Sequence, residues 1–243
     1  MSPRVAGATA LRVLTQLRHD PRTIAMLLLV PAVLLTLLRL LFDNDPRQWD
    51  AVGAPVLGLF PFITMFLVTS ITMLRERTTG TLERLMTLPV AKLDLLVGYG
   101  AAFGLVATAQ AGVSSAVAFG LLDLDVQGSV ATVVGLAVAN AILGMSLGLF
   151  VSAFARTEFQ AVQFMPALVL PQILLCGLLV PRSDMASALD TLAGVLPLTY
   201  AYEALRDASL GTTANLGRDL AVIVGFTVLS LAFGAATLRR RTP

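Results

Sequence analysis

Residues 129–154 read SVATVVGLAVANAILGMSLGLFVSAF, a run of 26 residues without a single Asp, Glu, Lys or Arg. A helix needs about 20 apolar residues to cross the hydrocarbon core of a bilayer, so this stretch predicts a transmembrane helix. Five further runs share its character, with Arg39 as their one charged residue, and cover residues 24–42, 52–74, 95–122, 159–180 and 220–238. With 13% charged residues, against about 25% in a soluble domain, the chain is predicted to be an all-α membrane protein with six transmembrane helices in one domain, 1–243.

The distribution of basic residues predicts the orientation of these helices. Of the 17 Lys and Arg residues, 12 lie in the segments that share a side with the N-terminus and four lie in the segments on the other side. Cytoplasmic loops carry the excess of Lys and Arg, so we expect both termini in the cytoplasm and the protein in the inner (plasma) membrane. The positive charges form short clusters between apolar runs, which indicates contact with lipid rather than with nucleic acid.

Residues 1–22 precede the first span and predict an amphipathic helix that lies in the membrane interface. Its apolar side holds Ala10, Leu11, Val13, Leu14 and Leu17. Arg12, Gln16 and His19 share the opposite side, and we expect this side to face anionic lipid headgroups. The alternative is a basic leader that only satisfies the orientation rule.

The loop at residues 75–93, between the second and third spans, predicts a short helix on the cytoplasmic side. Gly80 and Thr81 suit its start and Pro89 its end. Leu82, Leu85 and Met86 fall on one face, beside charged residues. We expect this apolar face to dock into a groove on a partner protein. The alternative is that it packs against the chain's own bundle.

The segment at residues 181–218 is too long for a simple turn on the outer side. It contains two apolar but short stretches, 185–189 and 192–205, and Pro197 interrupts the second. Short apolar helices of this kind indicate a re-entrant segment that caps a pathway, or else plain packing at the interface.

Three of these stretches resemble the permease subunits of type-2 ATP-binding-cassette (ABC) transporters. Residues 76–89, ERTTGTLERLMTLP, are similar to the family's Glu-x-x-x-Gly-Thr-Leu-Glu…Pro sequence before its third span. Residues 165–181 resemble its fifth span, and residues 196–206, LPLTYAYEALR, resemble its outer-face motif. Among the drug and antibiotic exporters of this family, the chain resembles the daunorubicin-type drug-efflux permeases in size and layout.

The resemblance implies an interfacial N-terminal helix, a coupling helix in loop 75–93 and short outer helices before the sixth span. It also implies that two permeases, as a homodimer or heterodimer, work with ABC ATP-binding subunits, which hold the ATP and Mg²⁺. The implied coupling residues are Glu76, Gly80, Thr81, Leu82 and Glu83, joined by the apolar Leu85 and Met86. The outer-face motif supplies Pro197, Tyr200, Glu203 and Arg206.

The chain has no phosphate-binding Gly-x-x-x-x-Gly-Lys-Ser/Thr sequence and no zinc-ligand spacing, so we expect a transport subunit that is not an enzyme and binds no cofactor or metal. Candidate pathway-lining residues are Gln110, Asn140, Gln163 and Gln172; interhelical hydrogen bonding is the alternative role for each. The sequence thus predicts the membrane part of an ATP-driven exporter for a hydrophobic or amphipathic drug, antibiotic or lipid. The alternative function is an ATP-independent channel or carrier.

Overall fold

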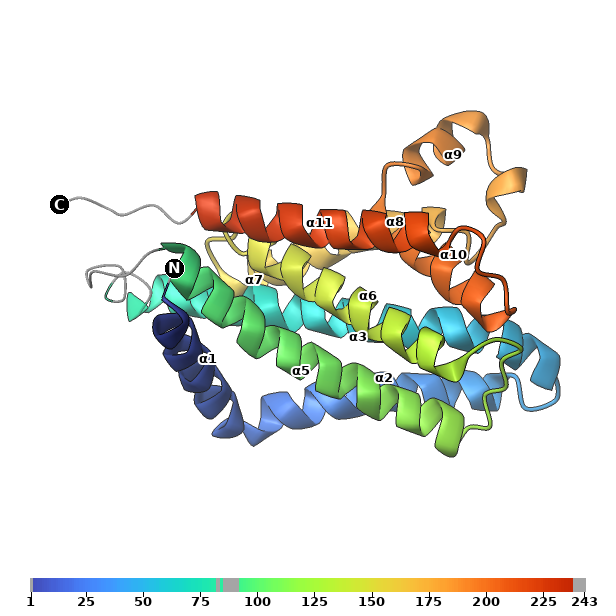
Figure 1. Cartoon of the computed structure of the whole chain (residues 1–243), viewed down its shortest axis with the longest axis horizontal. Helices are drawn as coiled ribbons and strands as arrows, with labels where there is room; N and C mark the ends of the chain where they lie inside the picture. The colour runs from blue at the N-terminus through green and yellow to red at the C-terminus, as the bar shows by residue number, and fades with distance from the viewer. Residues whose placement is uncertain (1, 82–83, 85–91, 238–243) are drawn as a thin grey trace.

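The computed structural model describes residues 2–81, 84 and 92–237, and within them it contains helices and no strands. Six helical segments are long and apolar enough to cross a membrane, as the sequence predicts. Figure 1 shows them side by side in one elongated bundle. The helices are α1 (Pro3–Arg18), α2 (Pro21–Leu41), α3 (Pro46–Thr78), α5 (Lys92–Gly120), α6 (Val130–Val151), α7 (Glu158–Phe164), η1 (Met165–Val169), α8 (Leu170–Leu175), η2 (Arg182–Asp184), α9 (Ser187–Ala193), α10 (Pro197–Ser209) and α11 (Leu216–Ala236).

The first two spans begin at matching Asp-Pro pairs. The carboxylate of Asp20 accepts a hydrogen bond from the backbone N–H of Thr23, and Pro21 occupies the first helical position of α2. Asp45 and Pro46 start α3 in the same way. An aspartate cap satisfies one of the free N–H groups of a new helix, and proline fits its first turn because no N–H is needed there.

The second span is longer than its apolar run. We predicted 52–74, whereas α3 has 33 residues and extends to Thr78. At 1.5 Å per residue it is about 50 Å long, so it projects beyond a hydrocarbon core of about 30 Å at both ends. The loop after it is correspondingly shorter than the predicted 75–93, because Arg75 and Glu76 belong to the last turn of α3.

The fifth span is one helical segment, Glu158–Leu175, but it contains a π-helical turn and ends earlier than predicted. We predicted one helix over 159–180, but α7 passes into a π-helical turn, η1, and then into α8, which ends at Leu175. Pro166 lies in the π turn and Pro171 follows it. Proline has no N–H for the helix ladder, and the wider π turn accommodates the loss.

Helices α3 and α6 form the centre of the bundle and touch backbone to backbone. A methyl group on Gly144 would overlap the carbonyl oxygen of Phe62, and one on Gly148 would overlap that of Phe66. The Thr69 hydroxyl adds a cross-helix hydrogen bond of 3.1 Å to the carbonyl of Met145. Small residues four apart are a common means of close helix approach in membranes, where packing rather than water exclusion holds helices together.

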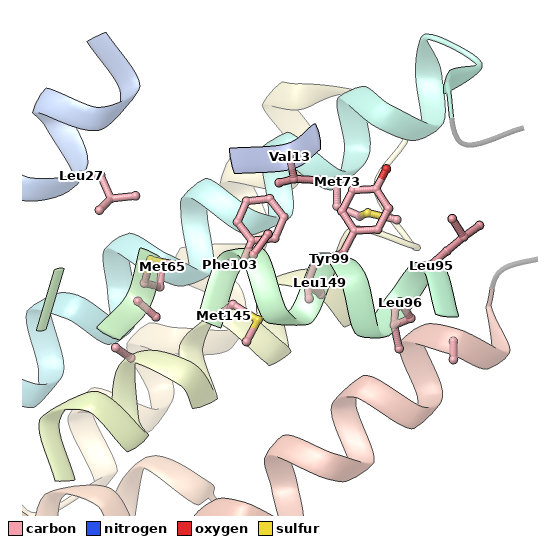
Figure 2. Packing of buried hydrophobic residues seen from close by; sticks show 14 of the residues in the cluster. Val13, Leu27, Met65, Met73, Leu95, Leu96, Tyr99, Phe103, Met145 and Leu149 are labelled. Atoms are coloured by element: carbon pink, nitrogen blue, oxygen red, sulfur yellow. The ribbon is translucent and has the colours of Figure 1, made fainter. Parts of the chain in front are cut away.

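The start of α1 and the end of α11 lie at the same end of the bundle (Figure 1). We call this the basic end, because α1 and the last turn of α3 carry Arg12, Arg75 and Arg77 there, and we call the opposite one the far end. Beneath the basic end, Val13, Met73, Tyr99 and Phe103 pack from α1, α3 and α5 into one buried cluster (Figure 2). This packing places α1 against the transmembrane helices.

Candidate coupling site

The predicted coupling segment follows directly on the last turn of α3. Helix α3 ends at Thr78, and Gly80 adopts a left-handed backbone with φ of +74°. The backbone N–H of Arg84 then donates to the carbonyl of Gly80 at 3.0 Å, and Thr81 and Arg84 have helical backbone. Glycine tolerates this left-handed conformation, which ends α3. The remaining predicted coupling residues, Leu82, Glu83, Leu85 and Met86, lie outside the described residues.

Glu76, two residues before the end of α3, is buried and joins three helices. Its carboxylate accepts hydrogen bonds from both terminal nitrogens of Arg12 on α1, at 3.3 and 3.2 Å. It also accepts one from the Tyr99 hydroxyl on α5 at 2.8 Å, while Arg12 donates to the same hydroxyl oxygen at 2.5 Å. The carboxylate and the guanidinium compensate each other's charge in a site where either alone would be costly.

This contact corrects the orientation predicted for the N-terminal helix. Arg12 points into the protein, to Glu76, and not toward lipid headgroups. On the predicted apolar side, Val13 is buried against α5 and Leu11 is 67% exposed. The helical period gives the relative positions of side chains on one helix. It does not show that the carboxylate of Glu76, 64 residues later in the sequence, lies next to Arg12.

Arg75, the neighbour of Glu76, ties α3 to the fifth span. Its Nε and Nη2 donate to the two carboxylate oxygens of Glu158 at 2.7 and 2.9 Å. Both side chains are more than half exposed, at 56% and 53%. The paired geometry fixes the direction of the contact, although solvent weakens its energy. Arg75 and Glu76, adjacent residues in the last turns of α3, therefore bond to α1, α5 and α7.

The far end carries a second ionic cluster, centred on Glu203 of α10. Its carboxylate pairs with Arg182 at 2.8 Å and with Arg218 of α11 at 3.2 Å. Arg182 also pairs with Asp190 of α9 at 2.7 Å. The hydrogen bond to Glu203, with a further one to Asp190, raises the pKa of the Arg182 guanidinium. The cluster thus links the segment after α8 with α9, α10 and α11.

The other predicted residues of the outer-face motif have different surroundings. Pro197 is buried at the first position of α10. The Tyr200 hydroxyl donates to the carbonyl of Gly194 at 2.7 Å, closing the turn before α10. Arg206 is exposed and forms no ion pair within the described part of the chain. Sequence reasoning missed Arg182 and Arg218, which no motif singled out.

Three of the four candidate pathway residues lie in helix contacts. The Gln110 amide is fully buried and donates to the Leu27 carbonyl at 2.9 Å and to the Thr64 hydroxyl. Asn140 is buried in α6, and its carbonyl oxygen has no hydrogen-bond partner among the described residues. Gln172 donates to the carbonyl of the residue four positions earlier. Gln163 alone is exposed on the outside of the bundle.

The sequence also matches known proteins. The model of the ABC-2 type transporter family covers residues 7–210, most of this bundle. The chain belongs to the ABC-2 type transporter family. Its spans and its link between α3 and α5 are therefore those of an ABC permease, the membrane subunit, which has no ATPase activity of its own.

Three relatives show how far the similarity of this permease extends. It is 28% identical over 189 residues to the probable multidrug ABC transporter permease YbhR of Escherichia coli, and this alignment covers 76% of this chain and 51% of the relative. It is 27% identical over 160 residues to the inner membrane transport permease YhhJ of Escherichia coli, covering 64% and 42%. It is 27% identical over 161 residues to ABC transporter G family member 20 of Dictyostelium discoideum, covering 66% and 22%. The chain thus spans about half or less of the length of these relatives.

Proposed function

We propose that this ABC permease forms a single transmembrane domain that exports a hydrophobic or amphipathic molecule, such as a drug, an antibiotic or a lipid, when a separate subunit hydrolyses ATP. In this proposal two permeases, identical or similar, work with two ATP-binding subunits that hold ATP and Mg²⁺. The name of the relative YbhR, a probable multidrug permease, supports this class of cargo. So does the resemblance to daunorubicin-type permeases.

The proposed orientation puts the basic end and both termini in the cytoplasm, in the inner membrane. The arginines of α1 and of the last turn of α3 gather at that end, as the orientation rule requires for the cytoplasmic side. YhhJ, an inner membrane permease by name, supports the choice of membrane.

One observation carries the proposal: the turn of α3 just before the predicted coupling segment is tied to three other helices. Glu76 holds α1 and α5, and Arg75 holds α7. A displacement of residues 79–91 by an ATP-binding subunit is therefore passed to four helices at once. In this mechanism Leu82, Leu85 and Met86 enter a groove on that subunit, and Glu83 sets the angle of docking.

We assign the remaining predicted residues to the outer mouth of this pathway and to the helices along it. The segment 181–218, held by the Glu203 cluster, caps the outer mouth, and its motif residues Pro197, Tyr200 and Arg206 shape that cap. The buried amides of Gln110, Asn140 and Gln172 set the spacing of helices along the route. The exposed Gln163 faces the passage between two permeases.

Substitution of Leu82, Leu85 and Met86 by Asp tests the docking step. We expect the ATP-binding subunit to dissociate on purification and its stimulated ATP hydrolysis to fall to the level of the isolated subunit. The control is Leu189→Asp, the same change at an apolar side chain that is 44% exposed at the far end. If the triple variant keeps both the complex and the stimulated hydrolysis, the proposal is wrong.

Transport by the isolated permease tests the alternative function. We expect liposomes that contain this chain alone to move no cargo down or against a gradient, because the proposed source of energy is absent. Cargo movement without an ATP-binding subunit would instead establish a channel or carrier.

A further inference from the structure

Two neighbouring grooves open between α1, α2 and α3 at the basic end. The first, of about 270 Å³, lies between α1, the start of α2 and the last turns of α3. The second, of about 300 Å³, runs between α2 and α3 within the membrane-spanning part. Thr23, Thr72 and Arg75 line both, so the two form one continuous slot. A concave, mainly apolar slot with a few placed polar groups is typical of a ligand site.

The chemistry of the slot changes in a fixed order along its length. The part within the membrane is apolar and is lined by Leu67, Val68 and Ile71 on α3, opposite Val30 on α2. The junction holds the guanidinium of Arg75 and two threonines. The part beyond the junction holds Asp20, Gln16 and Glu76. Apolar surface, a cation and an anion therefore follow one another from the membrane outward.

The charges at the polar end are available for a ligand to different degrees. Glu158 occupies the Nε and Nη2 of Arg75, whereas no described residue accepts a hydrogen bond from its Nη1. Glu76 is already compensated by Arg12. Asp20 and Arg75 form no ion pair with each other. Hydrogen bonds, chiefly from Thr23, lower the pKa of the Asp20 carboxyl, and the charge of Arg75 makes the smallest contribution. Each Asp20 carboxylate oxygen accepts one hydrogen bond from Thr23 and has a further lone pair, and Asp20 and Arg75 line the same groove.

We propose that this slot binds a phospholipid with a phosphate and a primary ammonium, of the phosphatidylethanolamine type, from the leaflet at the basic end. Its acyl chain lies between α2 and α3, its phosphate meets Arg75 and Thr72, and its ammonium meets Asp20. A phosphate accepts hydrogen bonds from arginine and threonine, and an ammonium donates to a carboxylate. The ordered sequence of chain, phosphate and ammonium in this lipid matches that of the slot.

Charge complementarity distinguishes this ligand from other lipids. A phosphatidylglycerol headgroup offers no cation to Asp20, and the quaternary ammonium of phosphatidylcholine has no N–H to donate. Arg18 and Arg22 flank Asp20 in the chain but line neither groove. The proposal does not depend on ATP-driven export, so its test uses the whole chain described above without an ATP-binding subunit.

Native mass spectrometry of the purified permease tests where the acyl chain lies. The protein, in a mild detergent, is incubated with equal amounts of the three lipids with identical chains. We expect one phosphatidylethanolamine to be retained in preference to the others. Val30→Trp fills the slot and should abolish this retention. Val33→Trp is the matched control: Val33 is 51% exposed one turn away on the same helix and lines neither groove.

Asp20→Asn tests the headgroup. Asparagine caps a helix as well as aspartate does, so α2 should keep its start while the slot loses its anion. We expect the preference for phosphatidylethanolamine over phosphatidylglycerol to fall about fivefold, the effect of losing one exposed ion pair. An unchanged preference overturns the proposal, as does equal lipid retention by the two tryptophan variants. A change of oligomeric state in Val30→Trp alone, with no loss of lipid, would show that a second copy covers the slot.

Discussion

The contact between Glu76 and Arg12 provides the sharpest test of how the basic end is held together. We consider Glu76→Gln, Arg12→Gln and the double variant. Glutamine keeps a carbonyl oxygen that accepts the hydrogen bond from Tyr99, so Glu76→Gln removes mainly the charge. The double-mutant cycle isolates the energy of the pair because neither substitution introduces a new charge.

The expected size follows from the burial of the pair. Glu76 keeps 9% of its side-chain surface exposed and Arg12 keeps 28%. Removing one partner of a fully buried pair costs about 3–5 kcal/mol, and an exposed pair contributes about 0–1 kcal/mol. For this intermediate case we expect Glu76→Gln to cost about 2 kcal/mol, with a coupling energy of about 1–2 kcal/mol. In a chain of this length, that cost lowers the melting temperature by about 4–8 °C.

Equilibrium unfolding in mixed detergent micelles, followed by circular dichroism, gives the four free energies. The exposed pair of Arg75 and Glu158 is the internal control, because the same cycle there should yield a coupling energy below about 1 kcal/mol. Additive effects of Glu76→Gln and Arg12→Gln, within about 0.5 kcal/mol, would refute the reasoning. They would show that α1 is held by its apolar packing alone.

Three further predictions concern the centre, the far end and the start of α2. Gly144→Ala should destabilise the protein by about 1–3 kcal/mol, because the added methyl group meets the backbone of α3. Gly135→Ala, on the open side of the same helix, should be neutral or stabilising. Thermal unfolding of the two variants measures this difference. Glu203→Gln should increase amide hydrogen exchange in α9 and α10 by about fivefold, because it weakens two ion pairs. The control Asp184→Asn loses only a local hydrogen bond and should leave this exchange unchanged. Hydrogen bonds from Thr23 are the main cause of the lowered pKa of the Asp20 carboxyl in the folded state. The helix cap that Asp20 forms is therefore complete above the unfolded pKa near 4 and is lost as the pH falls through the folded pKa. Amide exchange in the first turn of α2, corrected for its intrinsic pH dependence, should rise at that pH, and Asp20→Asn should remove this rise.

Much of the fold was predictable because the bilayer imposes a single strong constraint. All backbone polar groups must be paired within the hydrocarbon, so a long apolar run has to be a helix. The runs around 129–154 and 24–42 gave spans with bounds close to those observed. The ends of α3 were missed because polar residues there continue the helix into water, where composition no longer marks its limits. The π turn of the fifth span was missed because proline shows that a ladder is interrupted but not how the backbone compensates.

The partners of the site residues were harder to predict than the residues themselves. The motif at 76–89 pointed to Glu76, but nothing in it indicated Arg12, 64 residues earlier. Likewise Glu203 was predicted, whereas Arg182 and Arg218 were not. Ion pairs between distant residues depend on which helices are neighbours, and periodicity within one helix carries no such information. The arginine of α1 that meets this buried carboxylate can be singled out only once the position of α1 is known.

The two ties of α3 differ in strength, and this difference bears on the proposed mechanism. Helix α3 touches α6 backbone to backbone at Gly144 and Gly148, so we expect the two helices to shift together. The fifth span meets α3 through the exposed ion pair of Arg75 with Glu158 and through a small buried cluster that joins Leu74 to Ala161, and it contains the π turn η1. A displacement applied after Thr78 would therefore shift α3 together with α1, α5 and α6, while the fifth span bends at its π turn. Replacing Pro166 by Ala should stiffen that turn. If this variant slows cargo release without affecting ATP hydrolysis by the partner subunit, the fifth span bends after the coupling step and is not part of that step.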